Sequence, residues 1–329
     1  MAIGYGIFSG GLDSLLSARV LADQGVEVRL LTFVTPFFGA EKALISGQAL
    51  GLAPKIIDIT PDHLQMLPHP KHGFGRFMNP CIDCHALMFR RAGEIMQQEG
   101  GDFLFSGEVL GQRPKSQNPR ALTIVARESG FGDYILRPLS AVLLPPTRIE
   151  LHGLVDRSKL LDLSGRSRKR QMALAEKFGL SEYPTPAGGC LLTDPIFSRR
   201  LAELLAHSPR LEAREVELLK WGRHFRLPHG HKLVVGRNQP ENDILEQLSQ
   251  PGDLVLKAAD FPGPSVVFSP AGQDGQGLRP DLDLAASITL SYSDAPEGCT
   301  ALVQLIGSEV ERMTETESRP KQAFVQWMV

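Results

Sequence analysis

The chain has 329 residues with 35 basic and 37 acidic side chains, and its formal net charge of −2 gives no overall signal for nucleic-acid binding. Two domains are expected at this length, and 42% hydrophobic with 22% charged residues is typical of a folded protein with a core. A membrane span, a signal peptide and a secreted disulfide scaffold are excluded, because there is no long apolar run, no basic segment before the first strand and only four cysteines.

Short apolar runs alternate with helical patterns in the first part of the chain. In chain order, strands are predicted at residues 3–8, 27–33, 55–60, 102–107 and 122–126, and helices at residues 14–24, 39–50 and 85–99. This alternation predicts a doubly wound parallel sheet, in which ligands bind beyond the carboxyl ends of the strands. Residues 61–80 interrupt the rhythm with Pro, Gly and His, and are predicted to form a long surface loop.

The first predicted strand is followed by the sequence SGGLDS and then by a helix. Glycines allow a close approach of the backbone, and the free N–H groups of a helix N-terminus favour an anion, so this turn predicts a phosphate site. The hydroxyls add donors, and the aspartate is suited to orient a metal ion on the phosphates. The alternative is an ordinary capped helix. We favour nucleotide binding through Ser9, Gly10, Gly11, Asp13 and Ser14.

Three of the cysteines lie next to turns that are suited to thiol chemistry. Cys81 and Cys84 form a CxxC pair directly before the helix predicted at residues 85–99, and Cys190 follows a glycine-rich turn at residues 186–189. A helix N-terminus lowers the pKa of a thiol, so this position favours thiolates. Two cysteines on one turn and a distant third can converge on one site.

Three interpretations of these cysteines are open. In the first, Cys81, Cys84 and Cys190 hold a [4Fe–4S] cluster that leaves one iron free. In the second, the same three residues and either His85 or Cys299 hold a structural zinc ion. In the third, Cys84 and Cys190 shuttle a persulfide without a metal. Outside the zinc interpretation, Cys299 is expected to be a buried small residue.

The segment at residues 157–170 is strongly basic and contains a single acid, Asp162. It leads into a helix and is suited to hold RNA phosphates, although such charge runs also occur on solvated surfaces. The near-neutral net charge therefore conceals a local basic patch. The RNA contacts expected here are Arg166, Arg168, Lys169 and Arg170.

The C-terminal part of the chain has a different pattern. Residues from about 148 to 226 are mostly helical in pattern, and strands separated by Pro/Gly turns are predicted at residues 232–235, 254–258, 265–268 and 301–306. We therefore predict an α/β domain at residues 1–205, followed by a smaller α+β domain at residues 206–329.

The motif at residues 9–14 resembles the pyrophosphate loop (PP-loop) of the N-type ATP pyrophosphatases, which cleave ATP between its α and β phosphates to adenylate a substrate. The fold implied is that of the adenine nucleotide α-hydrolases, with the end of the second strand against adenine. Residues 105–112 are similar to a nucleotide-side motif of tRNA 4-thiouridine synthetases. The nucleotide and Mg²⁺ contacts that the resemblance implies include Asp13, which is also expected to be catalytic, and Thr32, Phe33, Gly107 and Gln112.

The sequence around the cysteines extends this resemblance. The NPCIDC context and the glycine-flanked Cys190 resemble the two catalytic cysteines of tRNA 2-thiouridylases, which implies catalytic roles for Cys84 and Cys190. With Cys81 the set is similar to that of the three-cysteine, cluster-dependent tRNA thiolases. We therefore favour the [4Fe–4S] cluster, with zinc as the alternative.

Residues 222–267 resemble the RNA-binding module of the NFACT group of ribosome quality-control proteins. The resemblance rests on the sequences LVVGRN, END and DLVLK, and it implies RNA contacts by Arg237 and Asn238. A plain β-hairpin is the alternative. The chain departs from the pattern of the group at Ala258 and Ala259, where an aromatic-histidine element is usual.

Together these features predict a cytoplasmic, ATP-dependent tRNA sulfurtransferase that adenylates a uridine carbonyl and releases AMP and pyrophosphate. The cofactors expected are ATP, Mg²⁺ and the cluster, and the partners are tRNA and a sulfur donor, either sulfide or a persulfide carrier. The alternatives are a PP-loop ligase or amidase for a small molecule with structural zinc, and a nucleotide-sensing RNA-binding factor without catalysis. The choice between 2-thio and 4-thio chemistry and the oligomeric state stay open.

Overall fold

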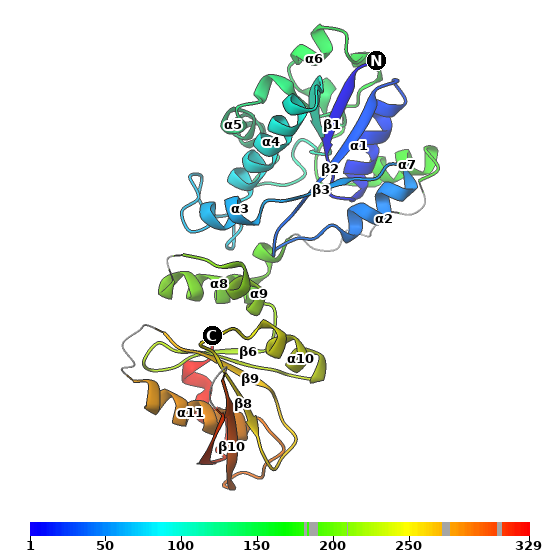
Figure 1. The fold of residues 1–329 in the computed structure, drawn as a ribbon. Helices are drawn as coiled ribbons and strands as arrows, with labels where there is room; N and C mark the ends of the chain where they lie inside the picture. Colours follow the sequence, from blue (N-terminus) through cyan, green and yellow to red (C-terminus); the bar gives the residue numbers. More distant parts are fainter. Residues whose placement is uncertain (181–182, 184–189, 209, 272–276, 308–310) are drawn as a thin grey trace. The chain divides into compact units, whose positions relative to one another are not determined.

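The computed structural model describes residues 1–180, 183, 190–208, 210–271, 277–307 and 311–329. They form two compact units, Met1–Asp194 and Pro195–Val329 (Figure 1). Helix α8 (Pro195–His207) thus belongs to the second unit, whereas the sequence pattern places most of it in the first domain. Within the described ranges, no helix combines the length and the apolar character that crossing a membrane requires.

The first unit is built on five parallel strands in the order β3-β2-β1-β4-β5. The strands are β1 (Ile3–Ile7), β2 (Glu27–Val34), β3 (Lys55–Asp58), β4 (Phe103–Ser106) and β5 (Ile135–Leu136). The helices are α1 (Leu12–Ala22), α2 (Glu41–Ala49), α3 (Thr60–Met66), α4 (Cys81–Gln98), α5 (Pro119–Ser129), α6 (Arg148–Leu151) and α7 (Lys169–Lys177). The strand order changes direction at β1 and β4, which is where doubly wound sheets bind ligands. The predicted sheet is confirmed.

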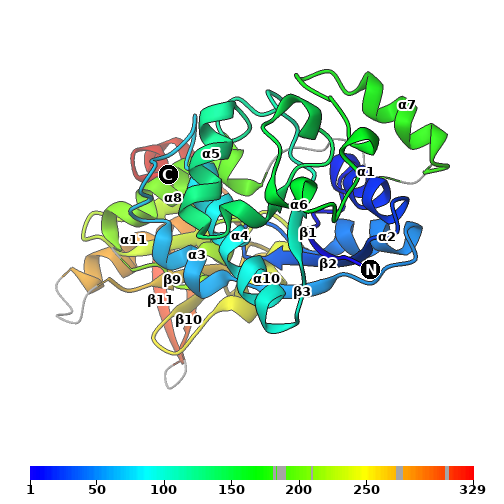
Figure 2. The same ribbon diagram turned by 90° about the horizontal axis from the view of Figure 1, so that it is seen from above.

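Alternate residues of the strands fill two cores on opposite faces of this sheet. In β2, Val28 and Leu30 pack in the core that also holds residues of α1 and α2, whereas Leu31 and Phe33 pack in the core that holds residues of α4 and α5. Figure 2 shows α1 and α2 on one side of the strands and α4 and α5 on the other. Burial on both faces explains why the strand segments are continuously apolar in sequence.

Two predictions for this unit are wrong. The apolar run at residues 122–126 favours a strand, but it lies in α5, because Asn118 caps the helix by accepting the N–H of Ala121 (2.9 Å) and Gly130 ends it in the left-handed conformation. These caps outweigh the strand propensity of the β-branched residues. The strand at this edge is instead β5. The predicted loop at residues 61–80 is also partly helical, because α3 occupies its start.

The second unit holds a six-stranded antiparallel sheet in the order β11-β10-β8-β9-β7-β6. The strands are β6 (Arg223–Arg226), β7 (Lys232–Val235), β8 (Leu254–Ala258), β9 (Val266–Ser269), β10 (Thr300–Ile306) and β11 (Glu311–Glu317). The helices besides α8 are α9 (Ala213–Leu218), α10 (Gln239–Leu248) and α11 (Leu278–Ser291). The four strands predicted from the sequence are confirmed, and β6 and β11 extend the sheet at its two edges.

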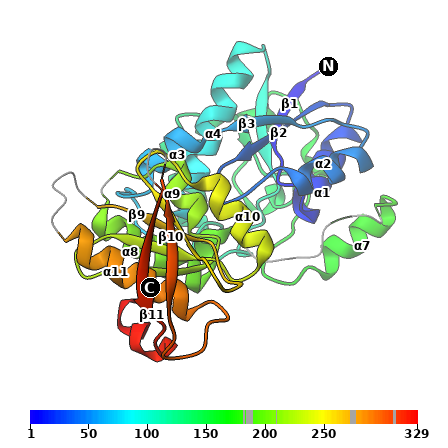
Figure 3. The same cartoon turned by 60° about the horizontal axis from the view of Figure 1, so that its bottom comes forward.

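The strands of this second sheet also divide their side chains between two cores. In β7, Leu233 and Val235 pack with residues of α11, whereas Val234 packs with residues of α9 and α10. Figure 3 shows α10 and α11 on opposite sides of the strands. The unit is therefore an α+β domain, as predicted, and its helices lie on both faces of an antiparallel sheet.

Candidate active site

The turn between β1 and α1 has the geometry of a phosphate loop. Gly10 has a φ of 72°, and a Cβ atom there would lie 2.3 Å from the carbonyl carbon and oxygen of Lys42. The Ser46 hydroxyl, at the buried face of α2, donates a hydrogen bond to the Gly10 carbonyl (2.7 Å). Only glycine satisfies both constraints at this position. The turn is therefore held tightly against α2, and it leads into the N-terminus of α1, where an anion is favoured.

The two serines of the motif brace the turn. The Ser14 hydroxyl donates to the Gly11 carbonyl (2.8 Å), and the Ser9 hydroxyl lies 3.5 Å from that of Ser14. The backbone N–H of Gly11 donates to the Ser9 hydroxyl (3.4 Å). Ser9 is exposed and Ser14 is buried, so Ser9 is the more accessible of the two hydroxyls.

The end of β4 brings a second segment against this loop. A Cβ atom on Gly107 would lie 2.5 Å from the backbone nitrogen of Ser14, so this glycine allows the close approach of the two segments. The Gln112 side chain donates through Nε2 to Oδ2 of Asp13 (2.8 Å). The other carboxylate oxygen of Asp13, Oδ1, is buried and has no hydrogen-bond partner among the described residues. The structure thus brings the predicted nucleotide residues of both segments together at Asp13.

The side chains at the end of β2 lie inside the protein. The Thr32 hydroxyl donates to the carbonyl of Phe8 (2.8 Å), and Phe33 is buried in the core that contains α4 and α5. The family resemblance implies adenine binding for both residues. Their backbone lies beside the phosphate loop, because Ile7 pairs with Leu31, but their side chains have structural roles.

The three cysteines of the first unit gather at one place. Cys81 and Cys84 occupy the first turn of α4, and Asn79 donates through Nδ2 to Cys81 Sγ (3.1 Å). The backbone N–H of Leu191 donates to the Phe37 carbonyl (3.3 Å), which holds the neighbouring Cys190 beside the loop that follows β2. The glycine-rich turn predicted before Cys190 lies outside the described residues.

The protonation of these thiols differs from the sequence-based prediction. Burial raises the pKa of Cys84 well above its usual range, and the neighbouring Cys190 and Cys81 raise it further. Burial and the proximity of Cys81 raise the pKa of Cys190 to about 11. Desolvation and mutual repulsion therefore outweigh the helix N-terminus, and the buried thiols are neutral without a bound cation. The lowered pKa expected for the CxxC pair is wrong for Cys84.

Three thiols in mutual electrostatic range are a donor set that suits zinc or an iron–sulfur cluster. Within the ranges that the structure describes, however, no three His, Cys, Asp or Glu side chains form a group ready to hold a metal ion. The two candidates for a fourth zinc ligand lie in different surroundings. His85 is engaged with Glu108 through Nδ1 (2.8 Å), and Cys299 lies in the second unit, partly exposed rather than buried as predicted.

A buried charged network next to the cysteines was not predicted. Oε2 of Glu108 accepts a hydrogen bond from Arg137 Nε (2.8 Å), and Oε1 of Glu108 lies 2.8 Å from His85 Nδ1. Burial alone would raise the pKa of Glu108, but Arg137 and His85 lower it to about 2. Glu108 and Arg137 are both buried, so the carboxylate is ionised and fully committed to this network. The signal in the sequence is a glutamate within an apolar segment directly after Gly107.

This network joins the cysteines to the phosphate loop. His85 follows Cys84 on α4 and contacts Glu108, and Glu108 follows Gly107, which packs on the backbone of Asp13 and Ser14. Each of these segments begins at the carboxyl end of the parallel sheet, where doubly wound folds place their active sites. The thiols and the turn after β1 are therefore linked through His85, Glu108 and Gly107 at one edge of the sheet.

The basic segment divides into residues with different surroundings. Arg166 and Lys169 are exposed, and Arg170 pairs with Asp162 (2.5 Å). Arg168 is instead directed at the phosphate loop, with its guanidinium 3.8 Å from Asp13 Oδ2. The structure thus separates this one arginine from the other predicted RNA contacts.

In the second unit, the predicted RNA contacts hold a turn in place. Asn238 is the N-cap of α10 and accepts the backbone N–H of Glu241 (3.0 Å). Arg237 donates through Nε to both carboxylate oxygens of Glu241 (2.8 and 2.9 Å), which lowers the pKa of that buried carboxyl. The Arg237 side chain is about half exposed, so a face of its guanidinium is still accessible.

Removal of the Asn238 cap is expected to lower the stability of the second unit measurably. Asn238→Ala is expected to lower the free energy of unfolding of the second unit by about 1 kcal/mol, whereas Asn238→Ser keeps the cap and the stability. Both tryptophans of the chain, Trp221 and Trp327, lie in this unit, so their fluorescence in a urea titration reports on it. Unchanged stability together with weaker tRNA binding would show that Asn238 serves RNA recognition instead.

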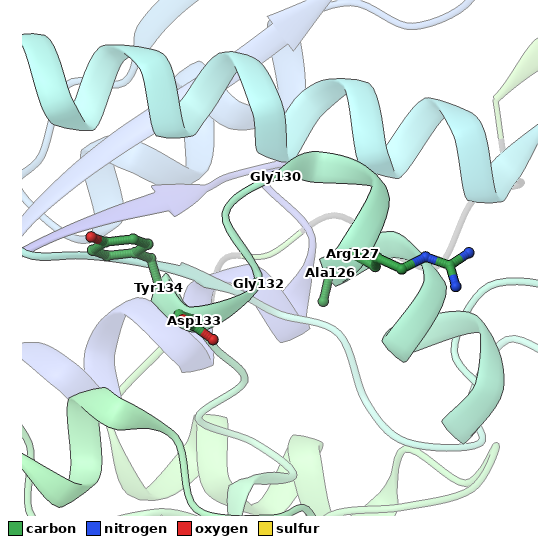
Figure 4. A pocket seen from close by; sticks show the side chains of 6 residues that line it. All are labelled: Ala126, Arg127, Gly130, Gly132, Asp133 and Tyr134. Carbon is green, nitrogen blue, oxygen red and sulfur yellow. The ribbon is translucent and has the colours of Figure 1, made fainter.

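A hollow of the first unit lies away from this site. It has a volume of about 290 Å³ and is lined by Ala126, Arg127, Gly130, Gly132, Asp133 and Tyr134, with the Arg127 and Tyr134 side chains at its two ends (Figure 4). It precedes the amino end of β5, the opposite edge of the sheet from the phosphate loop. Its position gives it no role in chemistry at the carboxyl edge.

Residues 222–328 match the family model described as the NFACT protein RNA binding domain, which confirms the predicted resemblance. A comparison with curated proteins finds no significant match. Among solved structures, the chain is similar to the predicted subunit of tRNA methyltransferase from Methanocaldococcus jannaschii, with 16% identity, a TM-score of 0.35, and coverage of 54% of this chain and 76% of that one.

Two further solved structures resemble the chain. One is the C-terminal part of the fibronectin/fibrinogen-binding protein from Streptococcus suis, with 15% identity, a TM-score of 0.29, and coverage of 75% of this chain and 90% of that one. The other is a 4-thiouridine synthetase in complex with RNA and with bound ATP, with 19% identity, a TM-score of 0.31, and coverage of 56% of this chain and 54% of that one.

Proposed function

We propose that this protein is an ATP-dependent tRNA-thiolating enzyme, which adenylates a uridine carbonyl and then replaces its oxygen by sulfur. The observation that carries the proposal is the convergence of a phosphate loop and three thiols, Cys81, Cys84 and Cys190, at the carboxyl edge of one sheet. A nucleotide site alone fits many enzymes. Activation and sulfur delivery must follow each other at the same carbon atom. A phosphate loop next to a set of thiols suits that order of steps.

In the first step, the uridine carbonyl oxygen attacks the α-phosphorus of ATP, and the bond from that phosphorus to the oxygen of the β-phosphate breaks. Pyrophosphate leaves with the electron pair, and the N3 proton of the base passes to water. The backbone N–H groups of the turn at residues 9–11 and the N-terminus of α1 face the phosphates in this proposal. Ser9 adds an accessible hydroxyl donor beside them.

In the second step, hydrosulfide attacks the activated carbon, and AMP departs with the electron pair of the C–O bond. Oxygen is exchanged for sulfur at the same oxidation level, so the step needs no oxidant or reductant. The raised pKa of Cys84 reflects the removal of its thiol from water, and the exclusion of water there would protect the adenylate from hydrolysis.

Two inorganic groups belong to this proposal. The unpartnered Oδ1 of Asp13 suits a Mg²⁺ ion that would neutralise the phosphates. Cys81, Cys84 and Cys190 would hold a [4Fe–4S] cluster, which supplies an open iron for sulfide when bound. A positive centre would also oppose the desolvation and the mutual repulsion that raise the pKa values of Cys84 and Cys190.

The match of residues 222–328 to an RNA-binding family model supports tRNA as the substrate. The target base must leave its stack to reach a buried site, which favours an unpaired position in the tRNA. The thiols are free, which suits the reducing conditions of the cytoplasm, where we place the reaction.

The decisive experiment combines purified protein, Mg·ATP, sulfide and total tRNA from cells that lack the gene. We expect AMP and pyrophosphate to be released only when tRNA is present, and one thiolated uridine to appear in the nucleoside mass spectrum. Release of AMP without tRNA would favour a small-molecule ligase. Absence of AMP release under all conditions would favour a nucleotide-sensing factor.

The variant Cys84→Ser separates the two steps. It is expected to keep tRNA-dependent pyrophosphate release and to lose at least about 100-fold in thiolation, because its serine cannot take part in sulfur delivery. Anaerobically purified wild-type protein should contain iron and acid-labile sulfide, which this variant loses. A colourless protein with stoichiometric zinc would contradict the cluster, and unchanged thiolation in Cys84→Ser would contradict the role of the cysteines.

A further inference from the structure

We propose that Arg168 binds the phosphates of ATP, and that it is a catalytic residue rather than part of the RNA-binding surface. The inference rests on the proposed function and deepens it. Its basis is the direction of the Arg168 side chain, which reaches the phosphate loop from a segment that composition alone assigns to RNA. No charge pattern in the sequence distinguishes Arg168 from its basic neighbours.

The fold fixes Arg168 beside the loop. Residue 168 is the N-cap of α7, and Ala175 of this helix packs in one buried core with Leu12 and Leu16 of α1 and with Val109. These residues flank the phosphate loop on both of its segments. The distance between α7 and the loop is therefore set by apolar packing, and Arg168 is not on a freely moving surface segment.

The pair formed by Arg168 and Asp13 is incomplete. Their nearest atoms are 3.8 Å apart, whereas a full ion-pair hydrogen bond is about 2.7–2.9 Å long. Arg168 Nε and Asp13 Oδ1 are each buried without a hydrogen-bond partner among the described residues. A buried donor and a buried acceptor that both lack partners indicate a place for a further group between or beside them.

Two glutamines hold the other side of this pair. Gln112 donates to Asp13 Oδ2 (2.8 Å), and the buried Gln171 of α7 donates through Nε2 to Gln112 Oε1 (3.5 Å). The carboxylate is thereby oriented with Oδ1 free for a cation, and the guanidinium of Arg168 is left with donors to offer. An anion that carries its own Mg²⁺ satisfies both groups at once, and Mg·ATP and Mg·pyrophosphate are such anions.

The chemistry of the step makes a guanidinium useful here. When the bond between the α-phosphorus and its bridging oxygen breaks, negative charge accumulates on the pyrophosphate that leaves. A guanidinium stays protonated throughout and offers two parallel N–H donors to phosphate oxygens, so it stabilises this charge without a proton transfer. An ammonium group supplies the charge but not the paired donors, so Arg168→Lys is expected to restore binding only in part.

The test compares Arg168→Ala, Arg168→Lys and the control Lys177→Ala, which removes the same charge from an exposed position at the far end of α7. Binding of Mg·ATP and Mg·pyrophosphate is measured by calorimetry, and binding of labelled tRNA is measured over a range of salt concentrations. We expect Arg168→Ala to bind both phosphate ligands at least about 10-fold more weakly and Arg168→Lys to be intermediate. Lys177→Ala should equal the wild type, and all variants should keep the same tRNA affinity and salt dependence.

The opposite pattern overturns the proposal. If Arg168→Ala and Arg168→Lys bind the phosphate ligands like the wild type, or lose tRNA affinity with a shallower salt dependence, Arg168 is an RNA contact. Arg168→Lys guards against a folding defect, because it preserves the charge and most of the packing. If the wild-type protein binds neither Mg·ATP nor Mg·pyrophosphate, the proposed function fails, and this inference fails with it. If the wild-type protein binds both phosphate ligands and the Arg168 substitutions leave this binding unchanged, only the inference about Arg168 is overturned and the proposed function stands.

Discussion

Replacing Glu108 by Gln is expected to lower the free energy of unfolding of the first unit by about 3 kcal/mol at neutral pH. Glu108 is the buried anion between Arg137 and His85, and the two contacts at 2.8 Å occupy both of its oxygens. The amide keeps the shape of the side chain but leaves Arg137 buried without a counter-charge. Loss of one partner from a buried pair is among the more costly single substitutions.

The same network predicts how this loss depends on pH. Burial opposes ionisation of Glu108, but Arg137 and His85 hold its pKa at about 2, below its ordinary value of 4.5. A carboxyl with a lowered pKa in the folded state stabilises that state above the unfolded pKa. The difference between wild type and Glu108→Gln should therefore be complete above about pH 5 and shrink as the pH falls towards about 2.

Urea titrations followed by far-ultraviolet circular dichroism measure this difference. Since Trp221 and Trp327 both lie in the second unit, their fluorescence serves as an internal reference that Glu108→Gln should leave unchanged. The matched control is Glu94→Gln, which removes a half-exposed partner of Arg91 on α4 and should cost less than about 1 kcal/mol. Equal losses in the two variants, or a loss that is independent of pH, would contradict the role of the buried network.

The local features of the first unit could be predicted from the sequence because short-range rules determine them. A strand followed by SGG and a helix allows few geometries, and the left-handed φ of Gly10 is a direct consequence of that turn. The prediction at residues 122–126 failed for an equally local reason, because the capping residues Asn118 and Gly130 outweighed an apolar run. Caps were a stronger signal there than the apolar residues between them.

The arrangement of the site depends on contacts that no local pattern contains. Cys190 lies far along the chain from Cys84, and its approach depends on a backbone hydrogen bond from Leu191 to Phe37. The direction of Arg168 depends on the packing of α7 against α1. The lowered thiol pKa was wrong for Cys84 because the sequence shows the helix N-terminus but not the burial that outweighs it. Charge, pKa and ligand sets all depend on such long-range neighbours.

Gly10→Ala is expected to weaken the binding of Mg·ATP and Mg·pyrophosphate by more than about 10-fold, the second large effect predicted here. The new methyl group would lie 2.3 Å from the backbone of Lys42, and backbone atoms of a helix cannot move away as a flexible side chain can. The turn must therefore shift and lose the hydrogen bond from Ser46 to the Gly10 carbonyl. A shifted turn no longer presents its N–H groups together with the N-terminus of α1.

Gly130→Ala is the matched control, because Gly130 has a similar φ of 77° but open space where its Cβ atom would lie. Both variants carry the strain of a left-handed alanine, about 1–2 kcal/mol, and both should lower the stability of the first unit by about that amount. Only Gly10→Ala adds the clash with α2, so only it should lose phosphate binding in calorimetry. If the two variants bind Mg·pyrophosphate equally well, the turn is a structural element and the phosphate site lies elsewhere.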